Sequence, residues 1–215
     1  MDRSQIGIVI PAFNESATIA AVVVLAKNYG MPIVVDDGSS DATAELAICN
    51  GAVVVAHKRN CGYDGALNSG FIKAAEIGCE VIVTVDADGQ HDPSLIQLFI
   101  DRIEAGADVV VGVRNQKQRL AEHMFALYAN LRFRIKDPLC GMKAYRATVF
   151  GALGHFDSYN SIGTELTMYA AKKGYQLDQI QFIVRERRDE PRFGRIFVAN
   201  YKIFRALILS IWYTK

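Results

Sequence analysis

Cysteine is scarce in this chain, and its spacing excludes two classes of protein. Only four cysteines occur among the 215 residues, and no two of them form a CxxC pair. Neither a disulfide framework nor a structural zinc site is therefore expected, and reduced cytosolic thiols are the default. The chain also has almost no excess of charge of one sign. The formal net charge is +1, so the chain lacks the global positive field typical of nucleic-acid-binding proteins.

Long apolar runs and glycine-rich loops are missing as well. No window reaches the roughly 20 uninterrupted apolar residues that span a membrane, and residues 1–3 lead directly into a short apolar run, so no signal peptide is expected. No G-x-G-x-x-G motif follows the first predicted strand, which argues against a dinucleotide-dependent oxidoreductase. Because 51% of the residues are hydrophobic, the chain can bury a full core. We expect one continuous domain over residues 1–215.

Short apolar runs alternate with helix-forming stretches in the first part of the chain. The predicted strands are 6–11, 32–35, 52–56, 80–85 and 107–113, and the predicted helices between them are 16–28, 41–50, 65–77 and 93–104. This alternation is typical of an α/β fold with a mostly parallel sheet covered on both faces. The later pattern predicts helices at 116–134, 161–173 and 196–215 and strands at 143–145 and 177–184. We therefore expect a nucleotide-binding half (1–115), an acceptor-side half (116–195) and a C-terminal amphipathic helix (196–215).

The apolar run 81–85 is the most informative stretch, because it ends in Asp86 and Asp88. Two carboxylates one residue apart at the end of a buried strand crowd negative charge, and Gly89 permits a sharp turn there. Mg²⁺ or Mn²⁺ bound by one or two carboxylates typically also contacts substrate phosphates. The stretch therefore predicts a cation site, with an Asp-rich surface turn as the alternative.

Polar residues also follow the first two predicted strands. Asn14 and Glu15 come after the first, and Asp36 and Asp37 after the second. In sheets of this kind ligands lie beyond the carboxyl ends of the strands, where a carboxylate can accept hydrogen bonds from a base or a ribose. These residues are thus predicted to share one edge with Asp86 and Asp88. The alternative is a set of turns and helix starts, which is the expected role of Asp41.

Five ordered segments, 11–15, 35–41, 86–91, 112–114 and 137–143, together resemble the family 2 glycosyltransferases. The branch they most resemble contains the dolichyl-phosphate mannose synthases and the polyprenyl-phosphate sugar transferases, and the likeness covers nearly the whole chain. It implies a GT-A (Rossmann-like) fold, a nucleotide-sugar donor, Mn²⁺ or Mg²⁺ as cofactor, and inversion at the anomeric carbon.

The resemblance also implies roles for individual residues. Nucleotide-sugar contacts are implied for Pro11, Phe13, Glu15, Asp36, Asp37, Asp86, Arg114, Arg188 and Arg192. Metal and diphosphate contacts are implied for Asp86, Asp88 and Gln90. Arg114 matches the basic residue that steadies the donor phosphates, which is reasonable because a metal and an arginine both stabilise the charge that develops on the leaving group.

Asp137 matches a carboxylate that the family places near the sugar and the acceptor, so the predicted catalytic residues are Asp137, Asp88 and Arg114. If the acceptor is a hydroxyl, Asp137 is the candidate general base. If it is a lipid phosphate, the acceptor is already ionised, and Asp137 would orient the sugar instead. The structural alternative is a helix-ending Asp-Pro turn.

Acceptor contacts are implied for Arg119 and Lys143. Glu122 stands where several lipid-phosphate enzymes carry a serine, and its charge is expected to repel a phosphate, so a lipid or sugar hydroxyl is an alternative acceptor. Of the basic residues at 185–195, Arg188 and Arg192 best match a loop that closes over phosphates in the family. The other arginines of this segment are equally well explained as a solvated surface.

The predicted helices 116–134 and 196–215 mix basic, bulky apolar and aromatic residues, as helices at a membrane surface do. The alternative is that both pack on the sheet as ordinary core. We therefore expect a cytoplasmic enzyme attached peripherally to the inner face of the cell membrane, with a nucleotide-sugar and a lipid as its partners.

The leading functional hypothesis is metal-dependent, inverting transfer of a hexose, most plausibly mannose from GDP-mannose, to a polyprenyl phosphate or a lipid hydroxyl. One alternative is a UDP-glucose-dependent transferase that acts on a glycan or a lipid. A sugar-phosphate nucleotidyltransferase is a weaker alternative, because segment 11–15 lacks the glycine-rich, basic signature of that class. A non-enzymatic alternative is a degenerate module that binds nucleotide-sugars at membranes.

Overall fold

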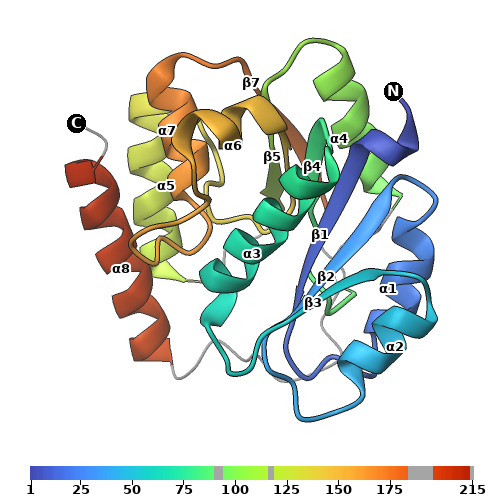
Figure 1. Cartoon of the computed structure of the whole chain (residues 1–215). Coiled ribbons are helices and arrows are strands. Elements are labelled where there is room, and N and C mark those ends of the chain that lie inside the picture. The colour runs from blue at the N-terminus through green and yellow to red at the C-terminus, as the bar shows by residue number, and fades with distance from the viewer. Residues whose placement is uncertain (90–93, 116–118, 184–195, 214–215) are drawn as a thin grey trace.

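The computed structural model describes residues 1–89, 94–115, 119–183 and 196–213. Within them, a seven-stranded sheet has the order β3-β2-β1-β4-β6-β5-β7 (Figure 1). The strands are β1 (Ile6–Ala12), β2 (Met31–Asp36), β3 (Val53–Ala56), β4 (Val81–Thr84), β5 (Val109–Arg114), β6 (Lys143–Arg146) and β7 (Leu177–Phe182). All neighbouring strands are parallel except β6, which runs antiparallel to both β4 and β5. The predicted α/β class with a mostly parallel sheet is confirmed.

Helices cover both faces of the sheet (Figure 1). One face carries α1 (Ile19–Ala26), α2 (Thr43–Cys49) and α4 (Leu95–Glu104). The other carries α3 (Gly62–Ile77), α5 (Leu120–Phe133), α6 (Ala147–Leu153), α7 (Glu165–Lys173) and α8 (Ile196–Tyr213). A short 3-10 helix, Arg3–Gln5, leads into β1.

Two apolar cores follow from the alternation of side chains along the central strands. Ile8 and Ile10 of β1 face the core under α1 and α4, whereas Val9 between them faces the core under α3, and all three are fully buried. Strands buried on both faces read as continuous apolar runs. On the α3 side, Gly70 permits close approach, because a Cβ atom there would lie 2.3 Å from Cγ1 of Val9.

The second half of the chain differs from the prediction in three places. The strand predicted at 143–145 is present as β6, but its place in the sheet was not predicted. It lies between β4 and β5, so both halves of the chain share one sheet. The short helix α6 was not predicted, because it follows β6 without any intervening turn residue. The helix predicted at 161–173 begins only at Glu165, since Ile162 and Gly163 have left-handed backbones with φ of 59° and 68°.

The sheet directs its functional segments to one edge. β1, β2, β4 and β5 all run in the same direction, because β6 is antiparallel to the two strands that flank it. The segments that follow these four strands therefore emerge at the same edge, as predicted. The segment that precedes β6 reaches that edge as well, because its strand runs the opposite way.

Helices α5 and α8 pack side by side on the α3 face (Figure 1). Phe125 and Ala129 of α5 and Ile203 and Ala206 of α8 are buried in the same core. Among the described residues, no helix combines the length and hydropathy that crossing a bilayer requires.

Candidate functional site

The loops that follow β1 and β2 interlock at the edge of the sheet. The backbone N–H of Asn14 donates to Oγ of Ser39 over 2.8 Å, and the side-chain Oδ1 of Asn14 accepts from the N–H of Ser40 over 2.8 Å. The N–H of Glu15 donates to Oγ1 of Thr43 over 2.8 Å. Asn14 has a left-handed backbone, with φ of 53°, a conformation that asparagine tolerates better than most residues. The two loops thus form one unit whose shape is fixed by side-chain to backbone bonds.

The residues predicted to contact the nucleoside lie at this edge. Phe13 is 38% exposed, so its ring is not part of the core. Glu15 is buried, and its Oε2 accepts from Oγ1 of Thr18 over 3.0 Å. Asp36 ends β2, is also buried, and accepts from the N–H of Ser39 over 3.3 Å. Pro11, near the end of β1, is partly exposed. The edge therefore brings these residues together, and their contacts with a nucleotide stay a prediction.

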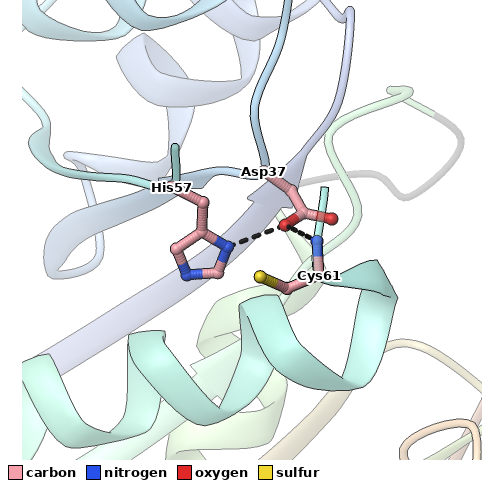
Figure 2. Close-up of side chains that lie close together, drawn as sticks. All are labelled: Asp37, His57 and Cys61. Atoms are coloured by element: carbon pink, nitrogen blue, oxygen red, sulfur yellow. Dashed lines mark hydrogen bonds and ion pairs between the residues drawn. The ribbon is translucent and has the colours of Figure 1, made fainter. Parts of the chain in front are cut away.

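Asp37 has a structural role that the sequence did not indicate. Its Oδ1 accepts from the N–H of Cys61 and from Nδ1 of His57, each over 2.7 Å, and its Oδ2 accepts from the N–H of Gly62 over 2.8 Å (Figure 2). A carboxylate at this position satisfies the unpaired N–H groups at the N-terminus of α3 and meets the positive end of its dipole. Its oxygens are therefore engaged by protein donors. His57 and Cys61 belong to no recognisable motif, so sequence reasoning missed them.

Asp86 and Asp88 lie just beyond the end of β4, and both are partly exposed. The phenol of Tyr63, in the first turn of α3, donates to Oδ1 of Asp86 over 3.4 Å. Burial, together with the charge of Asp86, raises the pKa of Tyr63, which keeps the phenol a neutral donor. Gln90, the third predicted metal contact, lies outside the described residues, as do Arg188 and Arg192.

A glycine packs closely against the carboxylate of Asp86. Gly141, in the segment before β6, packs against the carboxylate of Asp86, and a Cβ atom at this position would lie 2.4 Å from Oδ2. The missing side chain thus leaves room for the carboxylate at the exposed edge. Carboxylate oxygens are the ligands that Mg²⁺ and Mn²⁺ prefer. The donor set of Asp86 and Asp88 therefore fits the predicted cofactor.

Replacing Gly141 by alanine is expected to weaken metal-dependent binding of a nucleoside diphosphate by at least about tenfold, the scale seen when a metal ligand is misaligned. The added methyl group displaces the carboxylate of Asp86. Calorimetric titration with and without Mn²⁺ measures the effect. Gly151→Ala is the matched control, because a Cβ atom there meets nothing within 4 Å. Equal affinities in the two variants would contradict the assignment of Asp86.

A cluster of four charged side chains lies beyond β5. Nε and Nη2 of Arg114 donate to Oδ2 and Oδ1 of Asp137 over 2.8 and 2.9 Å, and the N–H of Arg114 adds a third bond of 3.1 Å. Glu122 accepts from Arg114 over 3.4 Å and from Arg119 over 3.2 Å. The nearby carboxylates raise the pKa of Arg114 despite its burial. The cluster thus balances two positive and two negative groups.

This cluster changes how two predicted roles are understood, those of Asp137 and Glu122. Asp137 is only 1% exposed, and both its oxygens accept from Arg114, so it would have to give up these bonds to act as a general base. Its geometry suits a positioning role. Glu122 is buried between two guanidinium groups, and its charge is compensated there. The repulsion of a phosphate expected from Glu122 is therefore offset, because the arginines on either side neutralise it.

Lys143 is buried, contrary to the open position expected of an acceptor-binding residue. The residue is 2% exposed, and Nζ donates to the carbonyl of Gly163 over 2.5 Å. Burial lowers the pKa of Lys143 to about 8. Asp64 holds the same loop, accepting from the N–H groups of Ile162 and Gly163 over 3.1 and 2.6 Å. The reason for the burial is the position of β6 inside the sheet, where helices cover its side chains.

Comparisons with known proteins agree with this architecture. Residues 7–163 match the family described as Glycosyl transferase family 2. An uncharacterised protein of Methanocaldococcus jannaschii is 28% identical over 98% of this chain and 93% of its own length. The undecaprenyl-phosphate 4-deoxy-4-formamido-L-arabinose transferase of Pseudomonas fluorescens is 34% identical over 69% of this chain. The chain spans 48% of that relative's length.

Solved structures show the same fold. Glucosyl-3-phosphoglycerate synthase from Mycobacterium tuberculosis, crystallised with Mn²⁺, UDP and phosphoglyceric acid, superimposes with a TM-score of 0.79 at 23% identity. The match covers 96% of this chain and 78% of that one. The same enzyme has also been crystallised with Mg²⁺ and UDP. The GT-A fold expected from the sequence is thereby confirmed. With a family match that covers most of its length, the chain belongs to glycosyl transferase family 2 and is a glycosyltransferase.

Proposed function

We propose that this glycosyltransferase moves a sugar from a nucleoside-diphosphate sugar to a lipid phosphate, with Mn²⁺ or Mg²⁺ bound at Asp86 and Asp88. The observation that carries the proposal is the shared edge of the sheet. The acidic pair follows β4, Phe13 follows β1 and Asp36 ends β2, and these three strands are neighbours in the sheet. One donor molecule would then bind with its diphosphate at Asp86 and Asp88 and its nucleoside at Phe13 and Asp36.

Two nucleotide-sugars are candidates for the donor, a UDP-sugar and GDP-mannose. The sequence favoured GDP-mannose by resemblance alone. The structural neighbour crystallised with UDP and Mn²⁺ favours a UDP-sugar. The relatives named as formamido-arabinose transferases favour a sugar other than mannose. We therefore put a UDP-sugar first and GDP-mannose second.

The chain's own residues account for the proposed chemistry. An oxygen of the acceptor attacks the anomeric carbon, the bond to the diphosphate breaks, and the configuration inverts. A bound Mn²⁺ or Mg²⁺ supplies positive charge where the leaving diphosphate becomes more negative. Arg114, held rigidly by Asp137, adds a fixed positive charge at the same edge, and such preorganised groups cost no rearrangement during the reaction.

A phosphate acceptor is supported by the state of Asp137. A phosphate is ionised near neutral pH and needs no general base, whereas a hydroxyl does. Because Asp137 is buried and bonded to Arg114 through both oxygens, it suits an acceptor that arrives without a proton to lose. Arg119, partly exposed and beside Glu122, is the proposed contact for the acceptor phosphate.

The test is a transfer assay that varies donor, acceptor and metal together. Radiolabelled UDP-sugars and GDP-mannose are offered with undecaprenyl phosphate, or with the matching alcohol, in Mn²⁺, Mg²⁺ or chelator. We expect label in the lipid phosphate with a UDP-sugar, and none with chelator. Equal transfer to the alcohol would contradict the phosphate acceptor. Metal-dependent donor binding without any transfer would favour the degenerate binding module instead.

A membrane contact is proposed for the outer surface of α5 and α8. Apolar side chains recur there at helical spacing and are exposed. On α5 they are Leu120, Met124, Leu127 and Leu131, and on α8 they are Tyr201, Phe204, Ile208 and Trp212. Soluble proteins rarely expose contiguous apolar patches of this kind without a partner. Exposed basic residues on the same helices, Lys202 and Arg132, suit the anionic inner leaflet of the cell membrane.

Replacing Leu127 and Leu131 together by aspartate is expected to lower vesicle binding on the order of 100-fold, because each leucine buried in lipid contributes roughly 1.5–3 kcal/mol. The two side chains are 60% and 78% exposed, so the folded state should tolerate the change. Flotation with anionic liposomes at low salt is the measurement. Ile48→Asp, at a 59% exposed position on α2, is the control. The proposal fails if the unaltered chain does not float.

A further inference from the structure

Three side chains with different ligand atoms meet at the N-terminus of α3. Asp37 follows β2, His57 follows β3, and Cys61 is the residue before α3. A carboxylate oxygen, an imidazole nitrogen and the thiol sulfur of this group all lie within 4.8 Å of one another. Figure 2 shows the three side chains converging from three separate segments. The metal pair Asp86–Asp88 is not part of this group.

We propose that Asp37, His57 and Cys61 form a second cation site, selective for a thiophilic divalent ion such as Zn²⁺. Imidazole and thiolate are the ligands that Zn²⁺ prefers, whereas Mg²⁺ and Mn²⁺ prefer oxygen. The protein would thus bind two classes of cation at one edge of its sheet. The ligand spacing has no CxxC pattern, so the sequence argued against zinc. The fold, however, brings together residues that lie 20 and 24 positions from Asp37.

The ligands are already oriented by their neighbours. Nε2 of His57 lies 2.8 Å from Oγ of Ser69 on α3, so the hydroxyl fixes the ring and leaves Nδ1 facing Asp37. Metal-binding histidines typically have such a partner on the other ring nitrogen. The carboxylate of Asp37 is held by the N–H groups of Cys61 and Gly62. Two of the three ligands therefore need little rearrangement.

Binding Zn²⁺ requires the His57 proton to move from Nδ1 to Nε2, where Oγ of Ser69 can accept it, and the Cys61 thiol to lose its proton. Two small shifts in position are also needed. Nδ1 of His57 and Oδ1 of Asp37 are 2.7 Å apart, and they must separate to roughly 3.3 Å, because each would lie about 2.0–2.1 Å from a tetrahedral ion. Cys61 is exposed, and its thiol Sγ makes a weak bond to the carbonyl of Arg59 over 3.4 Å. Its thiol can therefore rotate at small cost. The carboxylate and the thiolate together balance the two charges of the ion, and water completes the coordination.

Co²⁺ serves as the spectroscopic probe for this site. Metal-free protein in excess Mg²⁺ is titrated with Co²⁺ and then with Zn²⁺. We expect one equivalent of Co²⁺ with a near-ultraviolet thiolate-to-cobalt band and intense visible bands of tetrahedral geometry, all removed by Zn²⁺. Cys61→Ser should abolish the near-ultraviolet band and weaken Zn²⁺ binding at least about tenfold. Cys49→Ser, which changes the other exposed cysteine, should leave both unchanged.

A measurement on the unaltered protein guards against a variant that folds poorly. Zn²⁺ should protect Cys61, and not Cys49, from alkylation, as read by peptide mass mapping. The proposal is overturned if Cys61 is alkylated equally with and without Zn²⁺. It is also overturned if the cobalt spectrum lacks a thiolate band or is unchanged in Cys61→Ser. Because neither readout involves sugar transfer, these outcomes are independent of the proposed function.

Discussion

Replacing Asp88 by asparagine is expected to reduce sugar transfer on the order of 10³-fold, the scale of losing a main electrostatic contribution to a transition state. Asp88 is partly exposed beyond the end of β4, so the fold should survive. The amide keeps the shape of the side chain but loses the charge that holds a cation. Initial rates at saturating donor over a range of Mn²⁺ concentrations measure the effect, with circular dichroism as the check on folding.

Asp101→Asn is the matched control for this experiment. Asp101 is an exposed carboxylate on α4, and its amide variant should retain full activity. Binding of nucleoside diphosphate adds a second readout, because ligand stabilisation by mass action should require metal in the unaltered chain and disappear in Asp88→Asn. Turnover in Asp88→Asn within a factor of a few of the unaltered chain would rule out the metal assignment.

The second large effect is expected on stability. Asp137→Asn should lower the free energy of unfolding by about 3 kcal/mol, because removing one partner leaves the other charge of a buried pair uncompensated. Arg114 donates three hydrogen bonds to Asp137, and its side chain is 21% exposed. The loss is larger than for a surface pair because the Asp137 side chain is only 2% exposed, so water has little access to the donors that the carboxylate satisfies. Urea denaturation monitored by fluorescence gives the value.

An exposed pair in the same protein provides the comparison. Arg102 and Asp178 are 3.2 Å apart, but their side chains are 57% and 39% exposed. Asp178→Asn should therefore cost less than about 1 kcal/mol. A double-mutant cycle with Arg114→Gln and Asp137→Asn isolates the coupling between the two buried groups. A cost for Asp137→Asn as small as that for Asp178→Asn would contradict the role assigned to the buried pair.

The first half of the fold could be predicted because its signals are local. The apolar runs of β1, β2, β4 and β5 each give a strand within a residue or two of the expected bounds. The direction of parallel strands then places the carboxylates at one edge. The position of β6 could not be predicted in this way. Which strands pair across a long separation depends on tertiary contacts, which a four-residue strand does not encode.

In the candidate site, too, the features with a local sequence signal were predicted, and those that depend on distant segments were not. Asp86 and Asp88 stand out because a local pattern, an apolar strand that ends in two carboxylates, already suggests chemistry. The burial of Lys143 and the pairing of Asp137 with Arg114 depend on segments far apart in the chain. Residue type alone does not tell a positioning charge from a reacting one. The capping bonds of Asp37 were missed for the same reason, since its backbone donors lie at the N-terminus of α3, more than 20 residues away.

The reversed direction of β6 has a consequence for the evolution of specificity. The chain leaves the sheet at the reactive edge after β4 and β5, but it enters the sheet there before β6. The entering segment, 137–142, contributes Asp137 and Gly141 without being the exit of any parallel strand. A change in this segment would therefore alter the contacts of Asp137 with Arg114 and of Gly141 with Asp86 while the parallel strands keep their pairing. We expect substitutions in this inbound segment to change the chemistry of this edge without any change in the loops after β1 and β2.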